Sequence, residues 1–183
     1  QLGQNAMQRK KDEDGLTLIV GGATTSEPGA GATLTSGYIA SAKANISSNT
    51  TEPGNPPFRC VLHGFQIKDL YDELVAGVGT YVVNEGLTAR VFSQGFTLPI
   101  AGVEVYEDGN IAIDGSSDAV GGVFAREAIV LVQGRAPRVV DVRNEKRGGG
   151  GVHVYHYDEY AYGERNAGVW LYRMKSDATA PTS

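Results

Sequence analysis

The segment Val152-His-Val-Tyr-His-Tyr-Asp-Glu-Tyr-Ala-Tyr162 decides the fold class of this chain, because its residue types alternate with a period of two. Such alternation is typical of a strand in an antiparallel sheet that uses both faces. The same alternation occurs in three flanking segments, 122–132, 138–143 and 169–175. Turn-forming residues separate the four segments at 134–137, 144–151 and 163–168. The last third of the chain is therefore predicted to be an antiparallel meander.

Upstream of these strands the spacing of apolar residues predicts helices. Residues 1–20 are expected to be the end of a helix. A second helix is expected after a capping threonine, Thr33 or Thr35, and a third over residues 65–74. Residues 84–93 are a candidate for a further short helix. The apolar faces of the second and third helices have a spacing of three or four: Tyr38, Ile39, Ala42 and Ile46 in one, and Ile67, Leu70, Tyr71 and Leu74 in the other.

Two extended segments, 58–62 and 97–107, are expected among these helices, so the fold class is predicted to be α+β. The only cysteine, Cys60, lies in the first of them. A single cysteine excludes a disulfide or a thiolate zinc cluster within one chain. Its apolar neighbours favour the interpretation of a buried small hydrophobic residue.

The composition of the 183 residues is that of a globular chain, with 41% hydrophobic residues and a net charge of −5. The charge is uneven, because residues 1–118 carry 7 basic and 14 acidic side chains, and residues 119–183 carry 9 and 7. A net acidic chain is not expected to be a dedicated nucleic-acid binder, since phosphate affinity comes from Lys and Arg. Opposite charges on two parts of one chain favour head-to-tail self-association; the alternative is two ordinary solvated faces.

Three histidines are the first candidates for chemistry. His153 and His156, with Asp158 and Glu159 nearby, resemble a metal site in composition. On a strand, however, residues three apart point to opposite faces, so the two imidazoles are not expected to converge on a metal. His63 is expected to end a strand ahead of a helix and to pair with backbone there.

No motif in the sequence assembles a catalytic site. The glycine run 148–151 leads into strand-like residues and lacks the lysine of a phosphate loop, so we interpret it as a hairpin connection. Adjacent carboxylates, such as Asp72 and Glu73, do not face one another on a helix or a strand. We therefore predict no catalytic residues, no metal and no cofactor.

Tyrosines and arginines are instead concentrated in the predicted sheet. Both residue types are enriched at protein interfaces, since they bury area and keep a polar group. The set favours an extensive protein interface, and the alternative is a sheet with one solvated side. Its members are Tyr155, Tyr157, Tyr160, Tyr162 and Tyr172, with Arg135, Arg138, Arg143, Arg147, Arg165 and Arg173.

The order of four segments resembles the C-terminal part of a tailed-bacteriophage major capsid protein. The segments are Gln4-Asn-Ala-Met-Gln-Arg-Lys-Lys-Asp-Glu-Asp14, Val61-Leu-His-Gly-Phe-Gln-Ile-Lys-Asp-Leu-Tyr-Asp-Glu-Leu74, Leu98-Pro-Ile-Ala-Gly-Val-Glu-Val-Tyr106 and Ala119-Val-Gly-Gly-Val-Phe-Ala-Arg-Glu-Ala-Ile-Val-Leu131, followed by Lys175-Ser-Asp-Ala-Thr-Ala-Pro181. Together they span most of the chain in the order of the family.

The resemblance implies a division of the chain into parts of the capsid fold. Residues 1–20 would end the spine helix of the peripheral domain, and residues 21–118 would form the axial domain. Residues 119–175 would form the antiparallel sheet of the peripheral domain, and residues 176–183 a C-terminal tail. The N-terminal arm and the extended loop of the family are expected to precede Gln1 and to be missing here.

The function implied by the resemblance is mechanical. Many copies, as hexamers and pentamers, would tile an icosahedral shell around packaged double-stranded DNA, without sequence-specific contact. Decoration and portal proteins would be further partners, and no membrane is involved, since no apolar stretch is long enough to span one. The expected location is the virion, after assembly in the cytoplasm of a host bacterium.

Three alternatives stay open from the sequence. An encapsulin-type nanocompartment shell protein shares the fold and differs in its enzyme cargo. A decoration or minor virion protein would explain a tyrosine-rich sheet without a spine helix. A hydrolase using His63 or His153 is the alternative of a different class.

Overall fold

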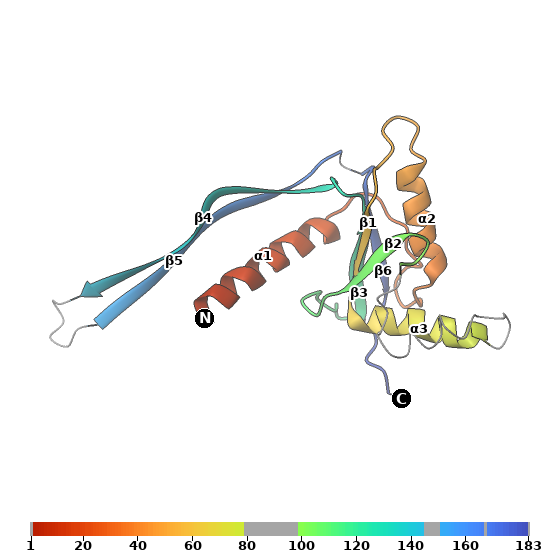
Figure 1. Cartoon of the computed structure of the whole chain (residues 1–183). Coiled ribbons are helices and arrows are strands. Elements are labelled where there is room, and N and C mark those ends of the chain that lie inside the picture. The colour runs from red at the N-terminus through yellow and green to blue at the C-terminus, as the bar shows by residue number, and fades with distance from the viewer. Residues whose placement is uncertain (1, 79–98, 145–150, 167, 183) are drawn as a thin grey trace.

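The computed structural model describes residues 2–78, 99–144, 151–166 and 168–182. These residues form a layered body and a long two-stranded ribbon that projects from it (Figure 1). The elements in chain order are α1 (Leu2–Val20), α2 (Ser36–Ser47), β1 (Phe58–Leu62), α3 (Gly64–Val78), β2 (Val103–Glu107), β3 (Asp118–Phe124), β4 (Ile129–Asn144), β5 (Gly151–Glu164) and β6 (Leu171–Asp177). The predicted α+β class is confirmed.

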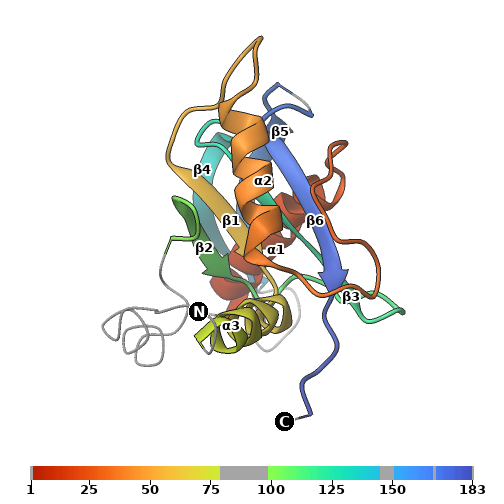
Figure 2. The same ribbon diagram turned by 90° about the vertical axis from the view of Figure 1, so that its right-hand side faces the viewer.

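A four-stranded sheet in the order β2-β1-β3-β6 forms the centre of the body. β1 and β2 are parallel, whereas β3 is antiparallel to both β1 and β6. α2 covers one face of the sheet and the C-terminal end of α1 lies against the other (Figure 2). α3 lies across one end of the strands (Figure 1).

The main core lies between α2 and the sheet. Ile39, Ala42 and Ile46 are fully buried on α2, as their spacing predicts, and they face the buried side chains of β1. Cys60 is one of these, and burial raises the pKa of its thiol far above the ordinary value. The prediction that Cys60 is a buried small hydrophobic residue is confirmed.

A buried glutamine joins α3 to the sheet. Gln66 is fully buried, and its amide nitrogen donates hydrogen bonds to the Ala119 carbonyl at 3.1 Å and to Ser176 Oγ at 2.6 Å. Its carbonyl oxygen accepts from the backbone N–H of His63 at 3.0 Å. Because a buried amide without partners costs stability, this bonded side chain fixes α3 against β3 and β6.

The middle of β3 requires glycine. A methyl group at Gly121 would collide with the carbonyl oxygen of Val61 and would lie 2.8 Å from Leu62 Cδ2. The missing side chain therefore allows β1 and β3 to approach at their normal spacing.

Gly121→Ala is expected to lower the free energy of unfolding by about 2 kcal/mol, because the backbone of β1 cannot move away without breaking its ladder. Chemical unfolding followed by circular dichroism measures the loss. Gly109→Ala is the matched control, since a methyl group there has nothing within 4 Å. Equal effects of the two substitutions would contradict the steric role of Gly121.

The predicted meander is wrong in its pairing. β3 and β6 pair with each other in the body sheet, and only β4 and β5 form the projecting ribbon. Residues 134–137, predicted as a connection, lie inside β4 at a β-bulge. The strand continues through them because both halves of β4 pair with β5. The candidate helix at 84–93 lies outside the described residues.

Candidate assembly interface

The ribbon is the candidate functional surface, and its pairing determines which side chains share a face. β4 and β5 are antiparallel from the pair Ile129 and Glu164 to the pair Asn144 and Gly151. Directly opposite residues of an antiparallel pair point to the same side. Among the described residues no third strand joins the ribbon, so both of its long edges are free.

One face of the ribbon lies against α1. The Tyr160 hydroxyl donates a hydrogen bond to Asp14 Oδ2 at 2.7 Å, and Lys11 Nζ lies 2.6 Å from Asp158 Oδ2. Lys11 Nζ also lies 5.1 Å from the centre of the Tyr160 ring. Polar contacts with α1 therefore hold the half of the ribbon that is nearer the body.

The hydrogen bond between Tyr160 and Asp14 changes the ionisation of both groups. The carboxylate of Asp14 raises the pKa of Tyr160 to about 12, because it stabilises the neutral phenol. Lys10, and then Tyr160, hold the pKa of Asp14 below its ordinary value. Since the folded pKa of Tyr160 lies above the unfolded value of 10.0, this contact stabilises the fold below pH 10 and is lost as the pH rises to about 12.

Ultraviolet titration is expected to assign a tyrosine step near pH 12 to Tyr160, as the difference between the native chain and Tyr160→Phe. Asp14→Asn removes the charge but keeps the side-chain shape, so we expect the midpoint of that step to move down toward 10. An unchanged midpoint in Asp14→Asn would contradict the assignment of the shift to this carboxylate.

A β-bulge opens the middle of the ribbon. Arg135 pairs with Glu159 and Arg138 with Tyr157, so Ala136 and Pro137 on β4 together oppose the single residue Asp158. The Asp158 side chain is 5% exposed, and neither of its oxygens accepts a hydrogen bond from the described residues, which leaves Lys11 as its ion-pair partner. A cavity of about 460 Å³ lies beside it, between α1 and the ribbon.

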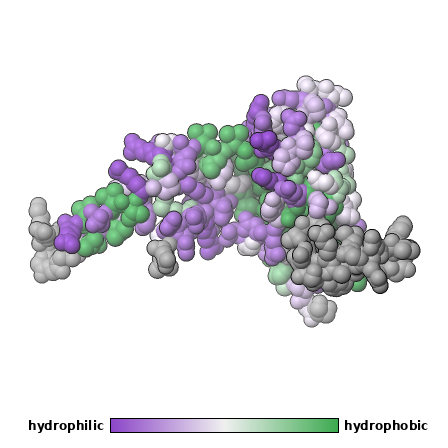
Figure 3. Space-filling model, viewed as in Figure 1, coloured by the Kyte–Doolittle hydropathy of each residue, from purple (hydrophilic) through white to green (hydrophobic). Residues whose placement is uncertain are grey.

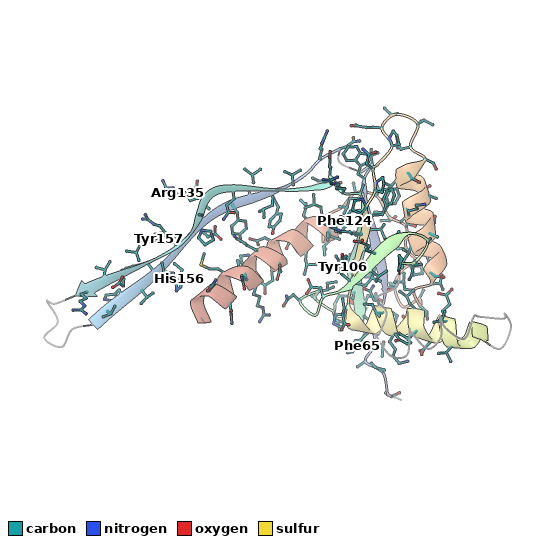
Figure 4. The ribbon with its side chains drawn as sticks, viewed as in Figure 1. Phe65, Tyr106, Phe124, Arg135, His156 and Tyr157 are labelled. Atoms are coloured by element: carbon teal, nitrogen blue, oxygen red, sulfur yellow. The ribbon has the colours of Figure 1, made fainter. Side chains whose placement is uncertain are left out.

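The other face of the ribbon is turned away from α1 and carries an aromatic row. His153, Tyr155 and Tyr157 stack along β5, with successive ring centres 6.3 Å apart. The Arg138 guanidinium lies 5.4 Å from the Tyr157 ring, and Arg135 Nε lies 3.3 Å from Glu159 Oε2. Figure 4 shows Arg135 and Tyr157 in this part of the ribbon. Tyr and Arg in this arrangement are typical of protein interfaces.

Apolar side chains are exposed along the whole ribbon. Figure 3 shows hydrophobic residues over both its near and its far part. Exposed apolar surface of this extent is typical of an interaction site. The exposed residues on the ribbon are Val130, Leu131, Val132, Val139, Val142, Val152, Val154, Tyr155 and Tyr157.

The histidines lie where the sequence predicts. His153 is opposite Val142 on the aromatic face, and His156 is opposite Val139 on the face toward α1, so the two imidazoles do not converge. His63 Nδ1 accepts a hydrogen bond from the Phe65 backbone at 3.2 Å, which confirms the predicted pairing with backbone. In the described part of the chain no group of three or more His, Cys, Asp or Glu could hold a metal ion.

The structure divides the predicted tyrosine and arginine set. Tyr155, Tyr157, Arg135 and Arg138 lie on the outer face of the ribbon, and Tyr160 lies toward α1. Tyr172 and Arg173 belong to β6 in the body, and Arg165 pairs with Glu127. Arg147 lies outside the described residues.

Sequence reasoning missed the six exposed valines of the ribbon. Their alternation is visible in the sequence, but it does not show which face of the ribbon another element of the fold covers. It also missed Lys11 and Asp14, which hold α1 against the ribbon. Within residues 2–78, 99–144, 151–166 and 168–182, no helix is long and apolar enough to cross a membrane.

Comparison with known proteins finds similarity in structure alone. No family model and no curated protein matches the sequence. The capsid of cyanophage P-SCSP1u is similar over 96% of this chain and 64% of that chain, with a TM-score of 0.69 and 14% identity. The capsid of Ralstonia phage GP4 is similar over 82% of this chain, with a TM-score of 0.57 and 16% identity, so this chain spans about half (49%) of that chain's length.

A virus-like particle from Pyrococcus furiosus is also similar, over 91% of this chain and 62% of that chain, with a TM-score of 0.54 and 8% identity. The three descriptions thus name two phage capsids and a virus-like particle. The fold expected from the resemblance to tailed-phage capsid proteins is confirmed.

Proposed function

We propose, from the fold that this chain shares with tailed-phage capsid proteins, that it is part of a major capsid protein whose copies assemble into an icosahedral shell around double-stranded DNA. The proposal places the protein in the virion, after assembly in the host cytoplasm, and gives it no catalytic role. Its partners are copies of itself, with decoration and portal proteins as further ones.

The observation that carries this proposal is the exposed apolar and aromatic surface of the ribbon. A two-stranded ribbon is marginally stable in water by itself, and three or more strands or a covering layer are needed. α1 covers only the part of one face nearer the body, while Val142, Val152 and Tyr155 farther out are exposed. In a shell, neighbouring subunits would cover the ribbon and shield these side chains from water.

The proposed division of the chain follows the family resemblance and the observed pairing. We assign α1 to the spine helix and residues 21–118 to the axial domain, whose sheet is completed by β3 and β6. Of residues 119–175, the ribbon then forms the peripheral sheet beside α1. The tail expected at 176–183 overlaps the end of β6, so we assign to it the residues that follow Asp177.

Two alternatives to a phage capsid protein remain to be distinguished. The similarity to the virus-like particle from Pyrococcus furiosus favours a nanocompartment shell with enzyme cargo as the second candidate. A decoration protein is disfavoured for two reasons. Residues Leu2–Val20 form a helix, and the structural similarity to the cyanophage capsid covers 96% of this chain.

Sedimentation and electron microscopy of the native source material test the proposal. We expect uniform shells of megadalton mass that contain this sequence and protect DNA from nuclease. Shells filled with protein cargo would support the nanocompartment instead. A soluble species of about 20–40 kDa, within the normal size of one domain, would contradict both.

A further inference from the structure

The far part of β5 has an edge without the features that normally protect an edge strand. Residues 152–157, Val-His-Val-Tyr-His-Tyr, contain no Lys, Arg, Asp, Glu or Pro, and all of them are exposed. Within the described residues β4 is the only strand that pairs with them, and the bulged residues of the ribbon lie on β4. An uncharged, uninterrupted edge of high β-propensity is a template for pairing with a strand of another molecule.

The opposite edge of the ribbon, on β4, is protected. Its far part carries Arg138, Asp141 and Arg143, and Pro137 lies in the bulge directly before them. Charged side chains, proline and bulges are the means by which native proteins keep an edge strand from pairing. Of the two edges of the ribbon, the β5 edge is therefore the one suited to a further strand.

The β5 edge is complementary to a second copy of itself. In an antiparallel pair with Tyr155 opposite its equivalent, His153 of each copy lies opposite Tyr157 of the other. The stacked row of each β5 then meets the row of the second copy, and aromatic pairs directly opposite one another stabilise a sheet. The charged β4 strands lie outermost, at least about 14 Å apart. This separation exceeds the screening length of about 8 Å at physiological salt, so their like charges do not oppose the pairing.

We propose that the β5 strands of two copies pair edge to edge and antiparallel around a two-fold axis at Tyr155. The inference rests on the proposed function as a shell subunit, and it names one contact of that shell. The pairing joins two marginally stable ribbons into one sheet in the order β4-β5-β5-β4, which has enough strands to be stable in water. Since the protected β4 strands form the outer edges, the contact closes with two copies. An icosahedral shell contains two-fold axes at which such a contact fits.

Single cysteines test this pairing in the whole chain. Tyr155→Cys places a thiol at the proposed axis, and the matched control Val142→Cys places one on the same face of β4, where the native side chains are 46% and 47% exposed. In the proposed dimer the two 155 positions are about 5 Å apart and the two 142 positions at least about 14 Å apart. A disulfide needs Cα atoms within about 7 Å. With oxidised glutathione we therefore expect Tyr155→Cys to form covalent dimers at least tenfold faster than Val142→Cys on non-reducing gels.

The native thiol does not interfere with this test, because Cys60 is buried in the body. A mixture of His153→Cys and Tyr157→Cys tests the register, since these positions lie opposite one another in the proposed pair. We expect the mixture to cross-link faster than either variant alone, because two copies of the same variant hold their thiols about 14 Å apart along the sheet.

A lysine on β5 tests the contact without a covalent bond. Tyr155→Lys gives the edge the charge that it lacks, so we expect the concentration needed for dimers to rise by tenfold or more. Val142→Lys leaves the β5 edge unchanged, so its dimers should form as in the native chain even if later growth of the particle is impaired. Light scattering after size exclusion measures the mass of the associated species, and thermal unfolding monitors the fold of each variant.

The outcomes separate two failures. Equal cross-linking of Tyr155→Cys and Val142→Cys would show that a neighbour covers the aromatic face and not the β5 edge, which overturns the inference and leaves the shell function standing. A mixture that cross-links no faster than its two components overturns the antiparallel pairing in the same way. A native chain that does not associate at any concentration contradicts the proposed function itself.

Discussion

Lys11→Met is expected to lower the free energy of unfolding by about 3 kcal/mol, because removal of one partner of a buried ion pair leaves the other charge uncompensated. Lys11 Nζ lies 2.6 Å from Asp158 Oδ2, and the two side chains are 20% and 5% exposed. The carboxylate has no hydrogen-bond donor among the described residues to replace the ammonium group. Urea unfolding at neutral pH measures the loss.

The double variant Lys11→Met with Asp158→Asn is expected to recover part of that stability, because it removes both charges. Lys10→Met is the matched control, since the Lys10 side chain is 64% exposed and its partner Asp14 keeps the hydrogen bond from Tyr160 when Lys10 is removed. A loss in Lys10→Met equal to that in Lys11→Met would show that burial of the Asp158 pair is unimportant.

Arg138→Glu is expected to raise the concentration needed for assembly by about tenfold or more, with little change in the melting temperature of the free chain. The Arg138 side chain contacts the Tyr157 ring on the outer face and has no ion pair within the described residues. Its charge is therefore available to a neighbouring copy. Light scattering during assembly measures the change.

Arg59→Glu is the control for this charge reversal, because Arg59 lies on β1 in the body, pairs with Glu104 and is 48% exposed. It should leave assembly close to native. If Arg138→Glu reduced the stability of the free chain as much as it reduced assembly, the residue would have a structural role and not an interface role.

Local patterns allowed most elements of the fold to be predicted. The spacing of Ile39, Ala42 and Ile46 places them on one face of a helix, and α2 buries these three residues as predicted. The period of two places His153 and His156 on opposite faces, as the ribbon has them. Such patterns are sufficient because they are set by neighbours in the sequence.

Strand pairing could not be predicted in the same way. Alternation identifies β3 and β6 as strands, but it does not say that they pair with each other around the whole ribbon. Gly134 and Pro137 are typical of a turn, and only pairing with β5 keeps them inside a strand. Likewise, the part of the candidate interface made by tyrosine and arginine was predictable from composition, whereas the exposure of Val142 and Val154 depends on which elements lie nearby.

Within the part of the chain that the structure describes, the ribbon contributes no residue to the two hydrophobic clusters of the body. Its amide hydrogens can therefore exchange with solvent through local opening of β4 and β5, without unfolding of the sheet that holds the cores. Under the proposed function, contact with neighbouring copies in a shell would complete the ordering of this ribbon. Ordering of the ribbon and growth of the particle would then be one thermodynamic event.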